Sequence, residues 1–475
     1  MSFLSAVTNI IWGPWTLGAF LLVGGYYSLR TGFFQIFGFP VWWRATVGSL
    51  FRRKKERKGR GAVTQLQALS TALAATIGTG SIAGIATAIF FGGPGAVLWM
   101  WLSAFVGMMT GCAEKILAIR YREKDGKGRW RGGPMTYIQK GLRLGWLAEL
   151  YALFCVAETL AGGNLAQANS IATSLHAAFG IDKLVVGIVL AVLTTFVLLG
   201  GIGRVGRLSE LLVPFMAGLF ILGGLAVIAV NWRAVPGALA QIVGYAFRPR
   251  AVVGGYSMGM ALRFGVARGV FTNEAGLGMS AIAHACADVE EPAEQGMWGI
   301  FEVFVSTLVI CTVTSLVILT AGVYSASEAV EMIARGIVPE TYLGAPLTAA
   351  SFASVLGTAG EGIVALCSVL FAFTSLLGAG YYGQRGIESL TERKWVLMLY
   401  RLAFPVCIIF GCIGDLTAVW QLVDLFNGLL ALPTLLALLL LSPEVLRIWK
   451  RWMARQRRRK ISSKEVVDGQ GGDVL

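Results

Sequence analysis

Long apolar stretches alternate with short polar ones along most of the chain. Each stretch is long enough to supply the roughly 20 residues that an α-helix needs to cross the hydrocarbon core of a membrane. The pattern predicts an all-α polytopic membrane protein with about 11 transmembrane helices. The predicted spans are residues 11–37, 64–91, 94–119, 146–177, 183–201, 208–231, 254–283, 295–322, 355–383, 395–413 and 416–441.

Two of these spans carry a polar, glycine-rich interruption. Span 64–91 contains Gly78-Thr79-Gly80-Ser81, and span 254–283 contains Asn273-Glu274 followed by Gly276. Main chain that leaves a helix at membrane depth must be buried in protein or line a wet cavity. Glycines alone can serve close helix packing, but packing does not explain Asn273 and Glu274, which are costly in lipid. We therefore predict helix breaks at Gly78 and at Asn273, Glu274 and Gly276.

The two interrupted spans are the second and the seventh, five helices apart. If the first span is an extra helix, two repeats of five helices follow. An odd number of spans gives the repeats opposite orientations, and paired interruptions of this kind mark the binding site of a transporter. The predicted division is an extra helix with the start of a basic loop (1–50), a first repeat (51–245), a second repeat (246–445) and a basic tail (446–475).

Composition supports a membrane protein. Hydrophobic residues make up 56% of the chain and charged residues only 14%, whereas soluble domains carry about 25% charged residues. The net charge of +14 comes largely from two basic clusters, at 52–60 and 447–460. Such tracts can bind nucleic acid, but both directly follow apolar segments, which favours the cytoplasmic face of a membrane and attraction to anionic lipid. No nucleic-acid partner is expected.

The loops predict an orientation. Placing the N-terminus outside and the C-terminus in the cytoplasm puts most basic loops inside, as the positive-inside rule requires. The acidic loop 288–294 is the exception, although acids influence orientation little. We expect a multi-pass protein of a bacterial or archaeal-type inner (plasma) membrane, with a disordered tail after Ser462.

The sequence predicts neither a cofactor nor catalytic chemistry. The seven cysteines lie mostly inside apolar runs without a CxxC pair, and the two histidines match no metal-ligand spacing. The chain has no HExxH or GxxxxGK[ST] motif, which argues against an enzyme of the zinc-protease type and against ATP-driven transport.

The order and spacing of several motifs resemble those of the alanine or glycine:cation symporter family, over about residues 11–445. The resemblance implies a LeuT-type (leucine-transporter-type) five-plus-five inverted repeat with one extra N-terminal helix. The most specific motif is RGVFTNEAGLG at 268–278. The others are ALAATIGTGSIAGIATA at 72–88, GGPG at 92–95, WMW at 99–101, GGPMTY at 132–137, NLAQAN at 164–169, FAFTS at 371–375 and YYG at 381–383.

The first break suits a small zwitterionic amino acid. The N-terminal end of a half-helix offers free N–H groups and a positive dipole to a carboxylate, which we assign to the main chain of Thr79 and Gly80. By resemblance, Gln167 adds a side-chain contact, while Phe271 and Thr374 close the pocket around a small side chain. As an alternative, Gln167 serves only as a helix–helix hydrogen bond, and Phe271 only packs.

Transporters of this fold hold a sodium ion between the first and eighth core helices. The matching groups here are the carbonyls of Ala74, Ile77 and Phe371 with the hydroxyls of Thr374 and Ser375. Carbonyl and hydroxyl oxygens suit this hard cation. A Thr–Ser pair in a helix also often bonds to its own main chain.

The chain departs from the family pattern at four positions. Ser81 stands where the family usually has Asn, Ser306 where it has Asp, Ala379 where it has Trp and Gln384 where it has Glu. The two serines remove oxygen ligands of the kind that a second cation would use. The missing Trp widens the expected pocket. Glu302, four residues before Ser306, is a candidate to restore the lost charge.

We therefore predict a secondary transporter that imports a small neutral amino acid, alanine or glycine, with sodium. The alternatives are coupling to protons, a larger amino acid as substrate, or a sensor that binds an amino acid without moving it. A channel is disfavoured because the chain shows no selectivity-filter repeat.

Overall fold

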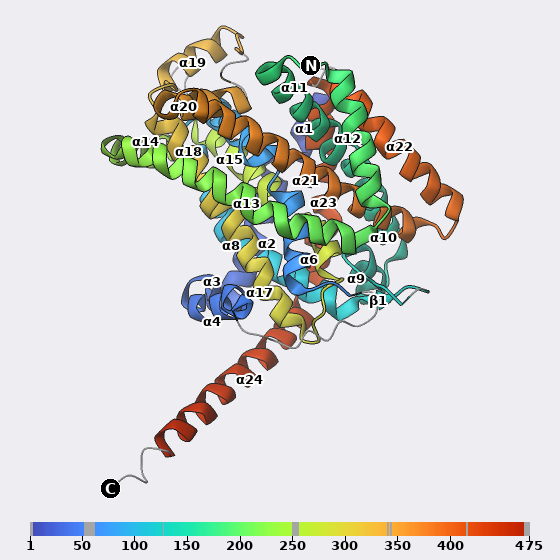
Figure 1. The fold of residues 1–475 in the computed structure, drawn as a ribbon. Helices are drawn as coiled ribbons and strands as arrows, with labels where there is room; N and C mark the ends of the chain where they lie inside the picture. Colours follow the sequence, from blue (N-terminus) through green and yellow to red (C-terminus); the bar gives the residue numbers. More distant parts are fainter. Residues whose placement is uncertain are drawn as a thin grey trace.

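The computed structural model describes residues 3–51, 62–126, 128–248, 256–339, 342, 344–414 and 417–469. Helices make up almost all of this part (Figure 1). Strands β1 (Glu123–Lys124) and β2 (Trp130–Arg131) form a small antiparallel hairpin, with Glu123 opposite Arg131.

The α-helices are α1 (Phe3–Ile11), α2 (Pro14–Arg30), α3 (Phe34–Phe37), α4 (Phe39–Ala45), α5 (Val47–Leu50), α6 (Gln65–Thr76), α7 (Ala83–Gly92), α8 (Ala96–Tyr121), α9 (Pro134–Tyr137), α10 (Gly145–Leu160), α11 (Gln167–Phe179), α12 (Lys183–Leu198), α13 (Gly201–Val230), α14 (Val235–Ala246), α15 (Met258–Asn273), α16 (Ser280–His284), α17 (Pro292–Val303), α18 (Thr312–Thr320), α19 (Ala326–Ala334), α20 (Ala345–Leu356), α21 (Thr358–Leu390), α22 (Lys394–Ile413), α23 (Thr417–Leu440) and α24 (Ser442–Gly469). Short 3-10 turns are η1 (Thr79–Ser81) and η4 (Trp232–Ala234), and π-helical turns are η2 (Ile138–Leu142), η3 (Ala161–Ala166) and η5 (Phe304–Cys311).

Seven helices in the described part are long and apolar enough to cross a membrane. The other four predicted spans are also helical. Three of them are broken, at 64–91, 146–177 and 254–283, and the fourth is the 16-residue helix α12. The all-α polytopic fold is therefore confirmed, whereas the residue limits of the two repeats stay a prediction.

The first break follows from local chemistry. Thr64 starts α6 with a capping box, since its hydroxyl accepts from Gln67 N and Gln67 Oε1 accepts from Thr64 N. The helix ends at Thr76, and Gly78 is extended, with φ −104° and ψ −158°. The chain then makes the single turn η1 before α7 resumes the span.

The second break depends on residues that tolerate a left-handed main chain. Helix α15 ends at Asn273, and Glu274 has φ 53°. Gly276 follows with φ 95° and Gly278 with φ 79°, a region that glycine enters at little cost. Helix α16 begins only at Ser280. Both predicted breaks are thus present.

A third interruption was not predicted. The span 146–177 is divided by η3, a π-helical turn that separates α10 from α11. Extra residues in a π-turn shift the register of a helix and occur often at functional sites. The side chains of α11 therefore point in directions that a regular continuation of α10 would not give them.

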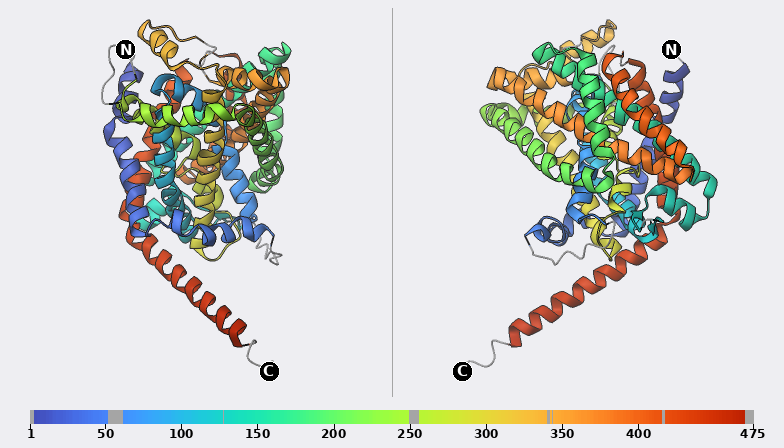
Figure 2. Two further views of the ribbon diagram at one scale, coloured as in Figure 1. Left: turned by 90° about the vertical axis from the view of Figure 1, so that its left-hand side faces the viewer. Right: turned by 45° about the vertical axis from the view of Figure 1, so that its right-hand side comes forward.

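The bundle has two distinct ends (Figure 2). Helix α24 leaves one end, called here the α24 end, and α19 and α20 cover the opposite end, called the α19 end (Figure 1). The predicted disorder after Ser462 is wrong up to Gly469, because α24 runs to that residue. The helix contains six Arg and three Lys, which are good helix formers. The basic cluster 52–60 lies outside the described residues.

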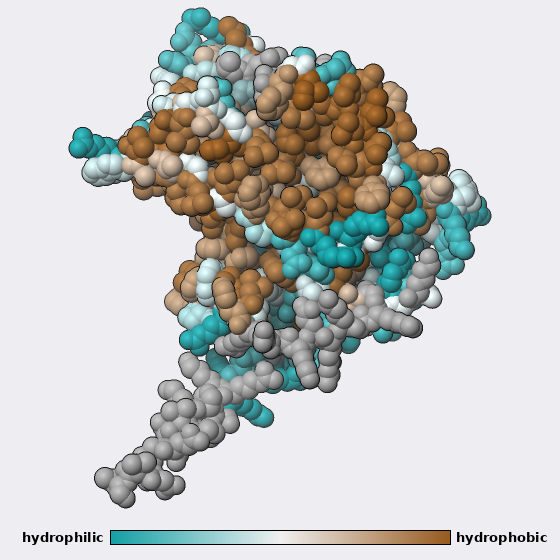
Figure 3. Space-filling model, in the orientation of Figure 1, coloured by the Kyte–Doolittle hydropathy of each residue, from teal (hydrophilic) through white to brown (hydrophobic). Residues whose placement is uncertain are grey.

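Exposed apolar side chains cover the outside of the bundle, as the brown surface of Figure 3 shows. They are frequent on α12, α13 and α22, where Val192, Leu211 and Phe410 are all more than half exposed. Soluble monomers rarely expose contiguous apolar areas of this kind. The surface is that of a multi-pass membrane protein.

Candidate functional site

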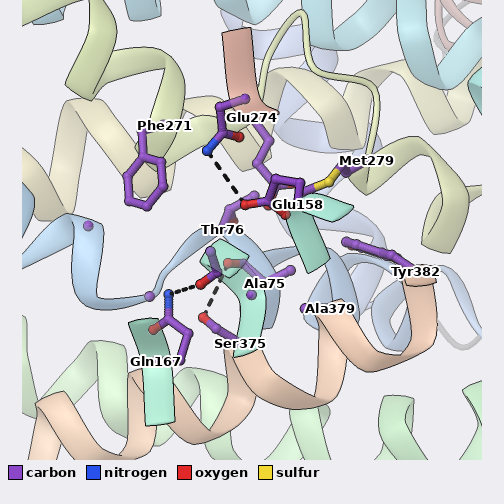
Figure 4. Close-up of a pocket in the computed structure, with 15 residues that line it drawn as sticks. Ala75, Thr76, Glu158, Gln167, Phe271, Glu274, Met279, Ser375, Ala379 and Tyr382 are labelled. Atoms are coloured by element: carbon purple, nitrogen blue, oxygen red, sulfur yellow. Dashed lines mark hydrogen bonds between the residues drawn. The ribbon is translucent and has the colours of Figure 1, made fainter. Parts of the chain in front are cut away.

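A cavity lies where the broken helices meet in the middle of the bundle (Figure 4). The space between its lining atoms, including its opening, is about 440 Å³. Its walls come from α6 and η1, α10 and η3, α11, α15 and the loop after it, α21 and α23. The lining residues are Ala75, Thr76, Gly78, Gly80, Glu158, Gly162, Gly163, Gln167, Phe271, Glu274, Met279, Ser375, Ala379, Tyr382 and Asn427.

The first break forms one wall of this cavity. Gly78 and Gly80 line it, and Thr79 between them is buried with its hydroxyl unpartnered. Thr79 N donates to Gln167 Oε1 at 3.4 Å. The predicted groups Thr79, Gly80 and Gln167 therefore meet at one point.

The unpredicted π-turn explains why Gln167 faces the break. Gln167 Nε2 donates to Gly162 O at 3.3 Å, five residues back along the bulged turn. This bond turns the amide toward the cavity and holds it beside Thr79. The geometry combines the two interpretations of Gln167, since one amide joins two helices and also lines the site.

Phe271 packs on the glycine at the break. A Cβ added at Gly80 would lie 2.6 Å from Phe271 Cε1, closer than real Cβ contacts. Glycine therefore lets the aromatic ring of α15 approach the main chain of η1. Phe271 lines the cavity, as predicted for a residue that closes the pocket.

Two of the predicted sodium ligands, Ala74 and Ser375, contact each other across α6 and α21. Ser375 Oγ donates to Ala74 O at 2.9 Å and to Ala75 O at 3.2 Å, across the two helices. Thr374 Oγ1 donates to Phe371 O at 3.0 Å within α21. Ile77 is the C-cap of α6, at the start of the break. Carbonyl and hydroxyl oxygens of both helices thus meet, as a sodium site requires.

Thr374 and Ser375 face different surroundings. Ser375 lines the cavity, whereas Thr374 does not, and its hydroxyl also lies 3.7 Å from Met216 Sδ on α13. Thr374 therefore does not lie on the cavity wall, where the predicted substrate contact would be.

The second break is braced from two sides. Asn273 Oδ1 accepts from Ala275 N at 2.9 Å, and Asn273 Nδ2 donates to Thr307 Oγ1 at 3.1 Å. Glu114 Oε1 of α8 accepts from Gly276 N at 2.8 Å. These bonds satisfy main-chain groups that leave the helix inside the bundle.

The Glu274 side chain lies at the second break without bracing it. Asn273 and Glu114 do the bracing, and the Glu274 side chain lines the cavity. Glu158, on the turn of α10 before the π-bulge, and Asn427 of α23 line the same part. Asn427 Nδ2 donates to Glu158 Oε1 at 3.5 Å. The amino-acid sequence alone does not show which way Glu158 points, and nothing in it marks Asn427 as a site residue.

Glu302 belongs to a separate buried cluster. Lys115 Nζ lies 3.0 Å from Glu302 Oε2 and 3.4 Å from Glu114 Oε2, and it donates to Ser280 Oγ at 2.7 Å. Glu302 Oε2 also lies 3.2 Å from His284 Nε2. Because Glu302 is paired and does not line the cavity, the structure does not bring its charge to the site.

Three of the departures from the family pattern differ in their relation to the cavity. Ala379 lines it directly and abuts Gly163. Ser81 and Ser306 do not line it, and both are fully buried. Of these positions, Ala379 is therefore the one that shapes the cavity.

Two broken helices around a central cavity define a secondary transporter rather than an enzyme. Residues 1–466 match the sodium:alanine symporter family, and the chain belongs to this family. It is 40% identical to an uncharacterized transporter of Haemophilus influenzae, over 98% of this chain and 99% of that protein. It is also 40% identical to the sodium/alanine symporter AgcS of Methanococcus maripaludis, over 93% of this chain and 95% of that protein.

The fold also occurs in a more distant transporter. A manganese transporter of Eremococcus coleocola superposes with a TM-score of 0.53 at 17% identity, covering 79% of each chain. This likeness concerns the fold alone. Together with the two breaks, it confirms the LeuT-type all-α arrangement that the sequence predicted.

Proposed function

We propose that the protein imports a small neutral amino acid, alanine or glycine, together with sodium by alternating access. The observation that carries the proposal is the convergence of Gly78, Gly80, Gln167 and Ser375 on one cavity at the first break. Family membership supports coupling of amino-acid transport to a cation. The relative AgcS is named for sodium and alanine.

The substrate carboxylate is assigned to the start of the half-helix after the break. The main chain of Thr79 and Gly80 supplies N–H groups at the positive end of the turn that leads into α7, and Gln167 supplies its amide. The substrate ammonium is assigned to the C-terminal end of α6, where Ala75 and Thr76 line the cavity. Carbonyls at that helix end carry partial negative charge.

Sodium is assigned to the oxygens between α6 and α21. With the ion bound, the hydroxyl of Ser375 and the carbonyl of Ala74 would share a cation instead of a hydrogen bond. The ion would fix the end of α6 and thereby the adjacent carboxylate site. Rocking of one repeat against the other then exposes the site to alternate sides.

The orientation assigned to the protein places the α24 end in the cytoplasm. The basic α24 emerges there, and the acidic-leaning segment around α19 lies at the opposite end. The positive-inside rule favours this arrangement. The apolar outer surface would face lipid in an inner (plasma) membrane.

Uptake by purified protein in liposomes tests the proposal. Labelled alanine and glycine are supplied with an inward sodium gradient, an inward proton gradient, or neither. Accumulation driven by sodium supports the proposal. Accumulation driven only by protons would mean that the coupling ion is the proton and not sodium. No uptake by folded protein would shift the assignment to a larger substrate or a sensor.

A pair of variants on α21 tests whether uptake depends on the assigned sodium site. Ser375→Ala removes the hydroxyl that contacts Ala74 O. Ser368→Ala removes a buried hydroxyl from the same helix away from the cavity. The proposal expects loss of sodium-driven uptake in the first variant and retention in the second.

A further inference from the structure

The cavity has an acidic side that binding of alanine does not use. Glu158 and Glu274 are 3% and 6% exposed, and both line the cavity. One carboxylate oxygen of each, Oε2, is buried without a hydrogen-bond partner. Neither side chain forms an ion pair within the described part of the chain, where Lys115 instead pairs with Glu114 and Glu302.

The neighbours of this acidic side add further polar groups. Tyr382 lines the cavity from α21, and its hydroxyl is buried and unpartnered. Asn427 contacts Glu158 through its amide nitrogen. Buried carboxylates are expensive unless a cation or hydrogen-bond donors compensate them. A bound group that carries positive charge and N–H donors would therefore compensate the unpartnered oxygens.

The acidic side is only a short distance from the site of the substrate carboxylate. Gly162 joins the two, because its carbonyl accepts from Gln167 Nε2 at 3.3 Å and a Cβ at this glycine would collide with Glu158 Oε1. Figure 4 shows Glu158 and Glu274 on one side of the cavity and Gln167 and Ser375 on the other.

The wall between the two sides is built of small residues. Gly162, Gly163 and Ala379 line the cavity here and present no large side chain. A methyl group, as in alanine, leaves the acidic side unfilled. An aliphatic chain of a few methylene groups reaches it, and the terminal ammonium has three donors for Glu158, Glu274 and the Tyr382 hydroxyl.

We propose that this cavity also takes amino acids with a second, side-chain amino group, whose ammonium binds between Glu158 and Glu274. The inference rests on the proposed function, because it assumes that the α-carboxylate binds at Thr79 and Gly80. It extends the substrates from small neutral amino acids to diamino acids of the size of ornithine.

Competition binding to the purified full-length protein in lipid nanodiscs tests the inference. Labelled alanine is displaced, in the presence of sodium, by ornithine and by norvaline, which has the same carbon chain but no side-chain ammonium. We expect ornithine to bind at least about tenfold more tightly than norvaline. Equal or weaker binding of ornithine would overturn the inference.

Substitutions of the two carboxylates test where the side-chain ammonium of ornithine binds. Glu158→Gln and Glu274→Gln are expected to weaken ornithine at least about tenfold while alanine and norvaline change less than about twofold. Glu149→Gln, at an exposed position of the same helix α10, is the matched control and is expected to change neither. Glu158→Asp keeps the charge and is expected to retain preference for ornithine over norvaline.

The outcomes separate this inference from the proposed function. Alanine binding without any preference for ornithine overturns the inference alone. Equal weakening of alanine and ornithine by Glu158→Gln also overturns it, because the carboxylate would then hold the α-ammonium. If the Gln variants changed only the dependence of binding on sodium, the acidic side would be assigned to an ion, and the inference would be overturned as well. Failure of the wild type to bind alanine with sodium overturns the proposed function itself. If a Gln variant does not fold, the comparison of ornithine with norvaline in the wild type still decides.

Discussion

Ser375 Oγ of α21 lies 2.9 Å from the carbonyl oxygen of Ala74 in α6. This bond joins a continuous helix to the end of a broken one, at the wall of the cavity. Any ion that binds between these two oxygens must change the position of the α6 end. The contact thus links the assigned sodium site to the assigned carboxylate site through a single turn of main chain.

A methyl group at Gly80 is predicted to abolish substrate binding. In Gly80→Ala, the added Cβ would lie 2.6 Å from Phe271 Cε1 and push the ring or the main chain out of place. We expect alanine uptake to fall at least about tenfold, which corresponds to roughly 1.4 kcal/mol of lost binding. Initial rates in proteoliposomes measure the effect.

Gly84 provides the control for that substitution. A Cβ at Gly84 would meet only Arg268 Cδ, at 3.8 Å, an ordinary contact. Gly84→Ala is therefore expected to transport at a rate close to that of the wild type. If both variants lost activity equally, helix packing rather than the shape of the cavity would explain the glycines.

The amide of Gln167 is predicted to act on substrate affinity more than on folding. Gln167→Ala removes the contacts to Thr79 N and Gly162 O. We expect KM for alanine to rise several-fold while the melting temperature in detergent changes little. Ser170→Ala, which removes a local bond to Ala166 O on the same helix, is the comparison variant. An unchanged KM in Gln167→Ala would leave only the structural role of the amide.

The buried cation Lys115 is predicted to hold the folded state together. Lys115→Met leaves Glu114 and Glu302 without their shared partner in a site that is fully buried. Removing one partner of a buried ion pair costs about 3–5 kcal/mol. We expect a clear fall in melting temperature for Lys115→Met and a smaller one for Glu302→Gln, because Gln still accepts a hydrogen bond.

Glu302→Gln also tests the alternative in which Glu302 supplies the charge missing at Ser306. That alternative requires Glu302→Gln to lose ion-coupled uptake while the protein remains folded. Full uptake by a somewhat less stable variant would agree with the pairing seen in the structure.

The assigned orientation predicts which positions react with an impermeant thiol reagent in intact cells. Ser327 at the start of α19 and Arg455 in α24 are exposed at opposite ends of the bundle. In a cysteine-free background, Ser327→Cys should react from outside, and Arg455→Cys only after the membrane is opened. The reverse pattern would invert the topology.

The sequence predicted the parts of this site that involve glycine and main chain. Gly78, Gly80 and Gly276 stand out because a transmembrane span with flexible, polar interruptions has few explanations. Gln167 and the Thr374–Ser375 pair were reached only through the resemblance to a family, because a lone polar residue in a span has several explanations.

Other parts of the site depend on tertiary contacts that no local pattern encodes. The π-turn at Ala161–Ala166 has no distinctive composition apart from its two glycines. Asn427 lies in an apolar helix far along the chain, and its approach to Glu158 follows only from packing. Glu274 was assigned to the correct break, but the sequence could not show that Asn273 brings the local main chain into a turn and leaves the carboxylate facing the cavity.

Equilibrium binding of alanine and sodium to the purified protein tests the central claim most directly. Each ligand is titrated at several fixed concentrations of the other by calorimetry or by binding of a labelled ligand. The account predicts that sodium lowers the Kd for alanine and that alanine lowers the Kd for sodium by the same factor, because the coupling free energy is reciprocal. Alanine binding that does not depend on sodium would contradict it.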